Sequence, residues 1–474
     1  MNRIWDFGAY GSHTALVDDT GVAVRYDALA ALQDELSGVA PGELTMMLCE
    51  NSIGALSGYA ALVNGGHPML MVSAGLPEDM RRKIMNTYRP GLVFAPRSLL
   101  GDYAHMREIR AIDDYALLRT SYLEPFPLHP ALGQMLTTSG STGSVKFVRL
   151  SWDDIRVNAQ ILVDILGMTS AERTLTALPM NYTYGLSVIC ASLTAGATMI
   201  VTRQGVMDEE FWDLFENERV TAFHGVPNTY DMLRRLDLFC EDFPDLRLMT
   251  QAGGKLSRDL HRYFARYAAD YGKRFVVMYG QCEATAAVSF LPAERALDKL
   301  GSVGIVVPGG EIELVDAEGN PIEGARTPGE LVYRGENVAL GYAERGEDLA
   351  RGDDWHGELH TGDIAERDED GDLYITGRLK RFIKIAGHRI SLDEIDERVM
   401  NDIHIRCVCS GVDDHLVVFA LSDGDAAVIR DFISRKMSVV RPAFRVEVID
   451  EFPLNESGKV LYGALLERAK SIIQ

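Results

Sequence analysis

The stretch TTSGSTGSVK at residues 137–146 combines Gly, Ser and Thr with a single Lys at its end. Gly is unfavourable inside helices and strands, and Ser and Thr hydroxyls compete for backbone hydrogen bonds, so this stretch must be a loop. Successive N–H groups of such a loop can form a concave anion site, to which the hydroxyls add donors and Lys146 adds a positive charge. These residue types predict a phosphate-binding loop, and the alternative is a flexible Gly/Ser linker.

The segments on either side of this loop favour phosphate binding over a linker. GQML, before the loop, is apolar enough to end a strand. FVRLSWDDIRVNAQILVDIL, after the loop, predicts a short strand, a helix N-cap at Ser151 and an amphipathic helix. A linker does not usually join two core elements. The loop is not a Walker A loop, because Ser144 and Val145 separate its last Gly from Lys146.

Two further loops follow predicted strands. YGQCEAT (279–285) comes after RFVVM, and TQAGGKLS (250–257) follows another apolar run. Ligands of open α/β sheets bind at the carboxyl ends of the strands. Gly253 and Gly254 allow a flat or charged ligand to approach closely, and the Glu283 carboxylate could bind the Mg²⁺ that accompanies phosphates. Taken alone, Glu283 is better explained as a solvated turn residue.

The elements that would position these loops alternate between strands and helices over roughly the first 300 residues. Strands are predicted for ELTMMLC, GLVFAP, ATMIVT, VTAFHGV, LRLMTQAG and RFVVMYG. Helices are predicted for 206–217, 228–238 and 257–272, the last beginning at an N-cap Ser257. This alternation predicts an α/β fold with a largely parallel sheet.

The pattern changes in the last third of the chain. From about residue 301, strands joined by Gly and Asn turns predict a small β subdomain. Residues 380–474 predict a small α+β unit that includes helices at SLDEIDERVM and 425–436. We therefore expect a large N-terminal domain over 1–379 and a small mobile C-terminal domain over 380–474.

Composition limits the possible classes of protein. The formal net charge of −22 on 474 residues weighs against nucleic-acid binding, which needs a basic face. The six Cys form no C-x-x-C pair, and the start MNRIWDFGAYGS lacks the apolar region of a signal peptide, so we expect free thiols and a cytoplasmic location. The most apolar stretch, 184–201, breaks at Ala195 and Gly196 and fits a buried helix and strand better than a membrane span.

Six segments, in order along the chain, resemble motifs of the adenylate-forming (ANL) superfamily, which includes acyl- and aryl-CoA synthetases, luciferases and the adenylation domains of peptide synthetases. These segments are TTSGSTGSVK, QAGGK, YGQCE, GELVYRGENVALGY, HTGDIAERDEDGDLYITGRLKRFIKIAGHRIS and PLNESGK. The resemblance implies an enzyme that uses ATP and Mg²⁺ to form an acyl- or aryl-AMP. The acyl group would then pass to a pantetheine thiol of CoA or of an acyl carrier protein.

The resemblance also implies roles for individual residues. Thr138 and Glu283 would bind Mg²⁺, and Lys459 would reach into the site for adenylation. Lys459, Glu283 and Thr142 are therefore the expected catalytic residues, since negative charge builds up at the α-phosphate. Lys380 occupies the hinge position between the two domains.

The remaining nucleotide contacts are carried over in the same way. The triphosphate would lie against the loop residues Thr138, Ser139, Gly140, Ser141, Thr142, Gly143 and Lys146. Tyr279 would stack on the adenine, and Asp363 would grip the ribose hydroxyls. The other implied contacts are Gly253, Gly254, Lys255, Gly280, Gln281, Cys282 and Arg378. Two positions depart from the family pattern, because Val145 replaces a Pro and Cys282 replaces a Thr, and a thiol is a poor hydrogen-bond donor.

The acid is expected between LPMNYTYGLS (178–187) and FHGVPNTY (223–230). Peptide-synthetase domains place an Asp in the first segment to pair with an α-ammonium group, and this chain has none, so a standard α-amino acid is disfavoured. The expected substrate contacts are Tyr182, Tyr184, Gly185, His224 and Val226. They suit an apolar or aromatic acid of modest size, although core packing explains the tyrosines equally well.

The acceptor stays open between CoA and a carrier protein. A basic cluster could meet either partner: Arg378, Lys380, Arg381, Lys384, His388 and Arg389. The alternative is that these side chains pair with the nearby carboxylates Asp393, Glu394, Asp396 and Glu397. Other hypotheses are an amine acceptor, nitrite activation for diazotisation on the same fold, and a non-catalytic AMP- or ATP-binding protein.

Overall fold

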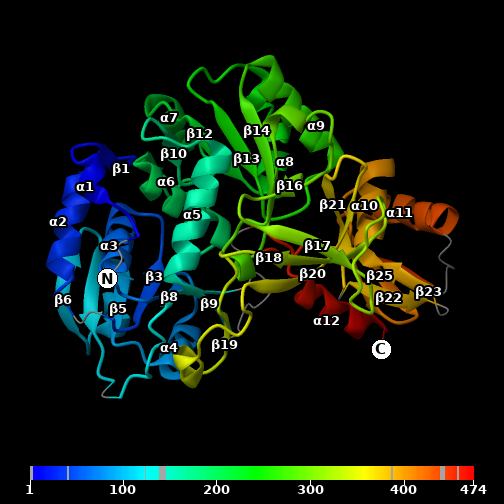
Figure 1. Cartoon of the computed structure of the whole chain (residues 1–474). Coiled ribbons are helices and arrows are strands. Elements are labelled where there is room, and N and C mark those ends of the chain that lie inside the picture. Colours follow the sequence, from blue (N-terminus) through cyan, green and yellow to red (C-terminus); the bar gives the residue numbers. More distant parts are fainter. Residues whose placement is uncertain are drawn as a thin grey trace.

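The computed structural model describes residues 4–39, 42–122, 124–137, 146–379, 381–385, 388–437, 443–455 and 458–473. Within these residues, two large β-sheets with helices between and outside them form the N-terminal part of the molecule (Figure 1). A smaller antiparallel sheet and a small α+β domain follow. The predicted α/β fold class is confirmed.

One large sheet has eight strands in the described part of the chain. In spatial order they are β19 (Gly341–Ala343), β9 (Phe147–Ser151), β8 (Leu132–Thr137), β4 (Met69–Ser73), β3 (Thr45–Cys49), β5 (Leu92–Pro96), β7 (Tyr115–Arg119) and β6 (Arg107–Ile112). The predicted phosphate loop joins the antiparallel neighbours β8 and β9. Two buried core strands therefore flank it, as the sequence predicts.

The other large sheet has nine strands among the described residues. In spatial order they are β16 (Ile305–Val306), β15 (Ser289–Leu291), β14 (Arg274–Tyr279), β13 (Leu248–Gln251), β12 (Ala222–Gly225), β10 (Arg173–Leu175), β11 (Thr198–Val201), β1 (Thr14–Asp18) and β2 (Ala23–Arg25). The neighbours β12, β13 and β14 are parallel. Their carboxyl ends therefore lie at one edge, which brings the loops 250–257 and 279–285 together.

Three helices pack between the two large sheets: α3 (Ile53–Asn64), α5 (Trp152–Leu166) and α6 (Thr183–Ala195). All of α3 is buried, and so is nearly all of α6, because each has a sheet on either side. Ser151 caps α5 through a capping box with Asp154. The predicted buried helix and strand over 184–201 are thus α6 and β11, separated by Gly196 with φ +71°. No helix among the described residues is long and apolar enough to cross a membrane.

The other helices of this part lie outside the sheets: α1 (Phe7–Tyr10), α2 (Tyr26–Leu36), α4 (Glu78–Tyr88), α7 (Glu209–Asn217), α8 (Pro227–Arg235) and α9 (Arg258–Asp270). The short 3₁₀ turns are η1 (Arg97–Tyr103), η2 (Leu238–Cys240), η3 (Cys282–Ala284), η4 (Ala293–Arg295) and η5 (Gly346–Ala350). The helix predicted over 228–238 is shorter than expected. It ends at Arg235 because Asp237 adopts a left-handed conformation with φ +52°.

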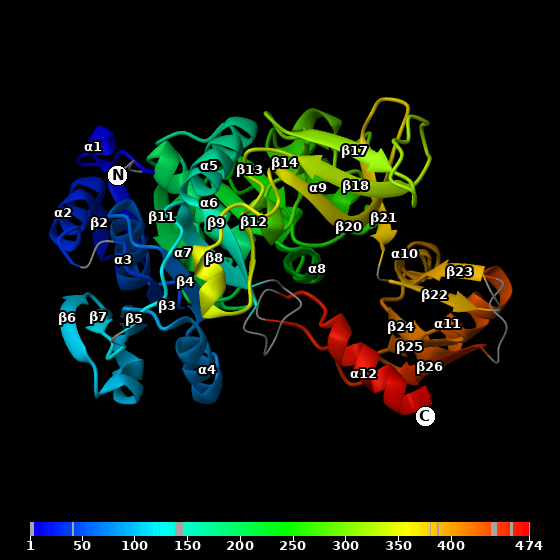
Figure 2. The same cartoon turned by 60° about the horizontal axis from the view of Figure 1, so that its bottom comes forward.

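The β subdomain predicted after residue 301 is a four-stranded antiparallel sheet in the described residues. Its strands are β17 (Glu311–Val315), β18 (Gly329–Arg334), β20 (Glu358–Arg367) and β21 (Leu373–Arg378). β21 leads directly into the C-terminal domain, which stands apart from the two large sheets in Figure 2. The β20–β21 hairpin therefore carries the chain from the large domain to the small one.

The small domain has its own hydrophobic core, to which Ile395, Val418 and Ile429 contribute. Its elements are β22 (Phe382–Ile385), β23 (His388–Ser391), α10 (Leu392–Ile403), β24 (Val408–Val412), β25 (His415–Ala420), α11 (Asp423–Lys436), β26 (Phe444–Val448) and α12 (Tyr462–Ile473). Helices α10 and α11 match the two helices expected for this region, whereas α12 was not predicted. All the cysteines are free, and Cys240 alone is exposed.

Candidate functional site

A cavity of about 2150 Å³ lies between the large domain and the small one. The loops after β13 and β14, the β20–β21 hairpin and the segment before α12 supply its walls. The predicted site residues that line this cavity are Tyr182, Tyr184, Val226, Gly253, Gly254, Lys255, Tyr279, Gly280, Gln281, Cys282, Glu283, Asp363, Arg378 and Lys459. The fold thus collects residues that are up to 277 positions apart, from Tyr182 to Lys459.

The predicted phosphate-loop residues Thr138, Ser139, Gly140, Ser141, Thr142 and Gly143 lie outside the described residues, as does the predicted hinge Lys380. Lys146, at the end of the loop, is described. Its ammonium lies 3.6 Å from the ring centroid of Tyr342 and 3.5 Å from the Glu344 carboxylate. Lys146 therefore lies directly before β9, with its charge beside the aromatic ring of Tyr342.

Glu283 follows β14 in the turn η3. The hydroxyl of Tyr342, from the edge strand β19, donates a hydrogen bond to Glu283 Oε1 at 2.8 Å. Glu283 is half-buried, and a carboxylate is a hard oxygen ligand, so this residue fits a Mg²⁺ ion. Tyr342 is a site residue that the sequence reasoning missed, although it ends the quoted motif GELVYRGENVALGY.

Two glycines of these loops are required by close approaches. Gly253 has φ +85°, and a Cβ on it would lie 2.2 Å from the Tyr182 hydroxyl. A Cβ on Gly280 would lie 1.4 Å from the carbonyl oxygen of Ala286. Both loops therefore fold tightly against neighbouring segments, and a side chain at either position would force those segments apart.

A chain of polar side chains crosses from β14 to the β20–β21 hairpin. The Tyr279 hydroxyl donates to Asp363 Oδ2 at 2.6 Å, and Arg378 Nε lies 3.0 Å from Asp363 Oδ1. Burial raises the pKa of Asp363, and the charge of Arg378 opposes that shift. The predicted adenine and ribose residues thus form one connected group.

Lys459 enters the cavity from the small domain. Its ammonium lies 5.1 Å from the ring centroid of Tyr182. Burial, together with the charge of Arg378, lowers the pKa of Lys459 to about 8, while Glu283 partly offsets this effect. A Cβ on the preceding Gly458 would lie 3.6 Å from the side chain of Val226, so the turn that carries Lys459 packs on the large domain. In this arrangement the small domain places its Lys beside the residues predicted for ATP.

Cys282, which replaces the usual Thr, is buried beside Thr183 and Tyr182. Burial raises the pKa of its thiol, and the Glu283 charge raises it further. A protonated, buried thiol is a poor nucleophile. The packing explanation for Cys282 is therefore favoured over a reactive cysteine.

The residues predicted to contact the acid fall into two groups. Tyr182, Tyr184 and Val226 line the cavity, whereas Gly185 and His224 do not. His224 is buried behind Tyr184, and both contact the Thr250 hydroxyl, at 2.6 Å from His224 Nδ1 and 2.5 Å from the Tyr184 hydroxyl. Burial lowers the pKa of His224 to about 3, so this ring is neutral and supports Tyr184 from behind.

Two of the basic side chains predicted near the domain junction, Arg378 and Arg381, form ion pairs in the described residues. Arg381 contacts Asp393 at 2.5 Å and Asp396 at 2.7 Å, and Arg378 contacts Asp363. Arg381 therefore pairs with two of the carboxylates of the pairing alternative, whereas Arg378 pairs with Asp363, which that alternative did not include. Asp396 also accepts a hydrogen bond from the backbone N–H of Cys409, so the Arg–Asp group anchors α10 on β24.

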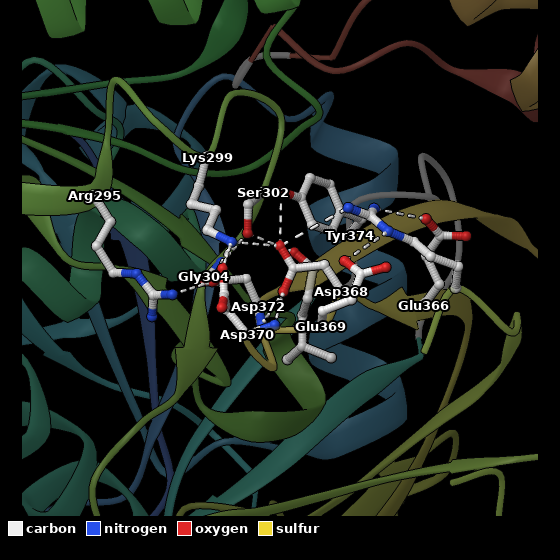
Figure 3. A network of polar contacts seen from close by, with 12 residues as sticks. Arg295, Lys299, Ser302, Gly304, Glu366, Asp368, Glu369, Asp370, Asp372 and Tyr374 are labelled. Atoms are coloured by element: carbon white, nitrogen blue, oxygen red, sulfur yellow. Dashed lines mark hydrogen bonds and ion pairs between the residues drawn. The ribbon is translucent and has the colours of Figure 1, made fainter. Parts of the chain in front are cut away.

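A second cluster of carboxylates lies where the β20–β21 hairpin meets the segment after η4 (Figure 3). Asp368, Asp370 and Asp372 surround the ammonium of Lys299, with Lys299 Nζ 2.8 Å from Asp368 and 3.4 Å from Asp372. Arg295 also contacts Asp372. The Lys299 ammonium takes the place that a metal cation would occupy, so the cluster is a structural ion-pair network.

Comparison with known proteins identifies a matching family and similar proteins for this chain. Residues 10–343 match the family described as AMP-binding enzyme. Feruloyl-CoA synthase of an Amycolatopsis species is 29% identical over 348 residues, which cover 70% of this chain and 69% of that protein.

Solved structures share the fold over the whole length. O-succinylbenzoate CoA synthetase from Bacillus subtilis, in complex with its acyl-adenylate intermediate, matches with a TM-score of 0.79 at 20% identity over 98% of each chain. ATP-bound MatB from Rhodopseudomonas palustris matches with a TM-score of 0.79 at 22% identity over 100% of each chain.

Proposed function

Because the chain belongs to the AMP-binding enzyme family of adenylate-forming acyl- and aryl-CoA ligases, we propose that its cavity adenylates a carboxylic acid and then transfers the acyl group to the thiol of CoA. The observation that carries this proposal is the position of Lys459. This Lys comes from the small domain, yet it lies in the cavity wall with Glu283, Asp363 and Arg378 of the large domain.

The first half-reaction follows from this charge distribution. A carboxylate oxygen of the acid attacks the α-phosphorus of ATP, the new O–P bond forms, and pyrophosphate leaves. The negative charge that builds up at the α-phosphate is stabilised by the ammonium of Lys459. Glu283 and Thr138 would hold Mg²⁺, which neutralises charge on the phosphates when it is bound. Lys146 would contact the β- and γ-phosphates with the remaining residues of the loop.

The nucleoside part of ATP would lie against the hairpin. Asp363 is buried and already hydrogen-bonded to Tyr279, so its carboxylate is held where it could accept hydrogen bonds from ribose hydroxyls. The ring of Tyr279, Gly253 and Gly254 would face the adenine. In the second half-reaction, the CoA thiolate attacks the carbonyl carbon of the acyl-AMP, the thioester bond forms, and AMP leaves.

The acid is proposed to be apolar or aromatic. Tyr182, Tyr184 and Val226 line this part of the cavity with mostly apolar surface, and the tight packing at Gly253 restricts its size. No Asp stands in the segment 178–187 to pair with an α-ammonium group. One relative, feruloyl-CoA synthase, is named for an aromatic acid, which supports the same class.

We propose that residues 1–379 and 380–474 move relative to each other between the two half-reactions, with Lys380 as the pivot. Lys459 must lie in the site for adenylation, whereas the thiol must later reach the same carbonyl carbon. One arrangement does not serve both steps easily, so a rotation of the small domain is the economical solution.

Pyrophosphate exchange into ATP, with a panel of aromatic and aliphatic acids, tests the first half-reaction. Product analysis with CoA, a carrier protein and amines tests the acceptor. Exchange with an aromatic or aliphatic acid and a thioester of CoA are the expected results. A folded protein that binds ATP and gives no exchange with any acid would contradict the proposal.

A further inference from the structure

Tyr342 connects two groups that come from distant parts of the chain. Its hydroxyl donates to Glu283 Oε1 at 2.8 Å, and its ring face lies 3.6 Å from the ammonium of Lys146. We propose that Tyr342 is a positioning residue that sets the Glu283 carboxylate and the Lys146 ammonium for one metal-bound triphosphate. This inference rests on the proposed function, and it assigns a role to a residue outside the predicted site.

The ring of Tyr342 is held by contacts that need no ligand. Strand β19 pairs with β9, and Tyr342 lies opposite Val148, two residues after Lys146. The rings of Trp355 and Tyr342 pack edge to face with 4.9 Å between their centroids, and the Tyr342 carbonyl oxygen accepts a hydrogen bond from Arg149 Nε at 3.1 Å. A side chain fixed in this way can orient its two neighbours, rather than following them.

The hydroxyl acts on the orientation of Glu283. An ordinary tyrosine phenol carries its proton at neutral pH, so the Tyr342 hydroxyl is a donor to Glu283 Oε1. With Oε1 of Glu283 bound to that proton, the carboxylate cannot rotate freely, and Oε2 is left to bind a cation. The hydroxyl therefore makes one carboxylate oxygen ready for the metal before it arrives.

The ring acts on the position of Lys146. A cation–π contact attracts an ammonium but does not neutralise its charge, because the ring carries no net charge. The Tyr342 ring thus holds the Lys146 ammonium on the same residue whose hydroxyl binds Glu283, and the ring adds no negative charge of its own. The exposed Glu344 carboxylate, 3.5 Å away, also pairs with the Lys146 ammonium, so phosphate oxygens would compete with Glu344 for this charge. The two functions of Tyr342 are separable, because one belongs to the hydroxyl and the other to the ring.

Binding of a non-hydrolysable ATP analogue, measured by calorimetry without any acid, tests both functions. The dissociation constant is measured in EDTA and in saturating Mg²⁺, and the ratio of the two values reports the coupling between metal and nucleotide. Tyr342→Phe keeps the ring and removes the hydroxyl, so the constant in EDTA should match the wild type, while the ratio falls on the order of tenfold. Tyr342→Leu removes both parts and should also weaken binding in EDTA.

A double-mutant cycle that combines Tyr342→Phe with Glu283→Gln keeps the test decisive if one variant folds poorly. Glu283→Gln should lose the coupling, and adding Tyr342→Phe to it should cause no further loss. Tyr88→Phe is the matched control, since the Tyr88 hydroxyl donates to the backbone of Ala343, next to Tyr342, at 2.9 Å. It should bind as the wild type does in both conditions.

A wild-type coupling ratio in Tyr342→Phe, or full additivity with Glu283→Gln, would overturn the inference. Because the binding measurement contains no acid, its result is independent of turnover. A wild-type protein that couples metal to ATP but gives no pyrophosphate exchange would refute the proposed function while leaving the role of Tyr342 standing.

Discussion

The ammonium of Lys255 lies 2.6 Å from Glu397 Oε2, which joins the loop after β13 in the large domain to helix α10 in the small one. Lys255 also donates to the carbonyl oxygen of Ile375 on β21. Close by, His404 Nδ1 at the end of α10 lies 3.3 Å from Asp259 on α9. These contacts are compatible with the arrangement that places Lys459 in the cavity, and the role expected for Lys255 beside the adenine remains a prediction.

Loss of the Lys255–Glu397 pair should weaken the adenylation arrangement. Glu397→Gln leaves the nucleotide residues intact, and we expect pyrophosphate exchange to fall by up to about fivefold, because a partly exposed pair contributes about 1 kcal/mol or less. Thioester formation from a preformed acyl-AMP should not fall. Glu394→Gln, an exposed Glu on the same helix, is the control. Equal loss in both half-reactions would contradict this role.

Lys459 should impose an upper pH limit on adenylation. Because its pKa is about 8, the Lys459 side chain is protonated and positively charged below that pH and loses this charge as the pH rises through 8. Because the charged form stabilises the transition state, kcat/KM for ATP in the exchange assay should fall above about pH 8. Lys459→Ala should nearly abolish exchange while leaving ATP binding largely intact. Lys459→Arg keeps its charge and should lack this pH limit, even if it is slower. The same alkaline limit in the Arg variant would assign it to another group.

Gly253→Ala should disturb the acid site through Tyr182. The left-handed backbone costs about 1–2 kcal/mol for Ala, and the new methyl group would meet the Tyr182 hydroxyl. Gly272→Ala has a similar φ of +65° with nothing within 4 Å, so it carries the backbone cost alone. We expect both variants to lower the unfolding midpoint and only Gly253→Ala to weaken exchange. Tyr182→Phe in the Gly253→Ala background should restore part of the lost exchange.

Lys380→Pro tests the proposed pivot. A hinge residue changes φ and ψ during the motion, which Pro prevents. We expect one half-reaction to stay near the wild-type rate and the other to slow, measured by exchange and by thioester formation from synthetic acyl-AMP. Wild-type rates in both would place the pivot elsewhere or exclude the rotation.

Lys299→Met should destabilise the fold at neutral pH. It removes the ammonium that Asp368 and Asp372 share, and these side chains are buried. Lys299 lowers the pKa of Asp368, so the wild type keeps this stabilisation above about pH 4 and loses it as pH falls through the folded pKa. The gap between wild-type and variant unfolding midpoints should therefore narrow toward acid pH. Lys470→Met, which breaks the exposed pair with Glu467, should leave the midpoint unchanged.

The sequence alone was sufficient for the fold class and for part of the local elements. Hydrophobic periodicity and turn residues are local signals, so strands such as Arg274–Tyr279, the N-cap Ser151 and the buried helix before Gly196 were predicted with the correct type. The end of α8 was missed, because a left-handed Asp237 has no clear local signature. The loops at the carboxyl ends of β13 and β14 were also predicted, since Gly residues directly after apolar runs are local turn signals.

The tertiary structure alone decided which side chains meet. Tyr342 contacts Glu283 across 59 positions of the chain, and Lys255 contacts Glu397 across 142, so no local pattern could pair them. His224 was predicted at the acid, yet the register of β12 and β13 turns it toward Thr250 behind the cavity wall. Residue types and their order determine the chemistry that this chain can offer. Sheet order and domain placement determine which groups are close enough to act together, because Coulomb forces and hydrogen bonds depend on distance in space and not on distance along the chain.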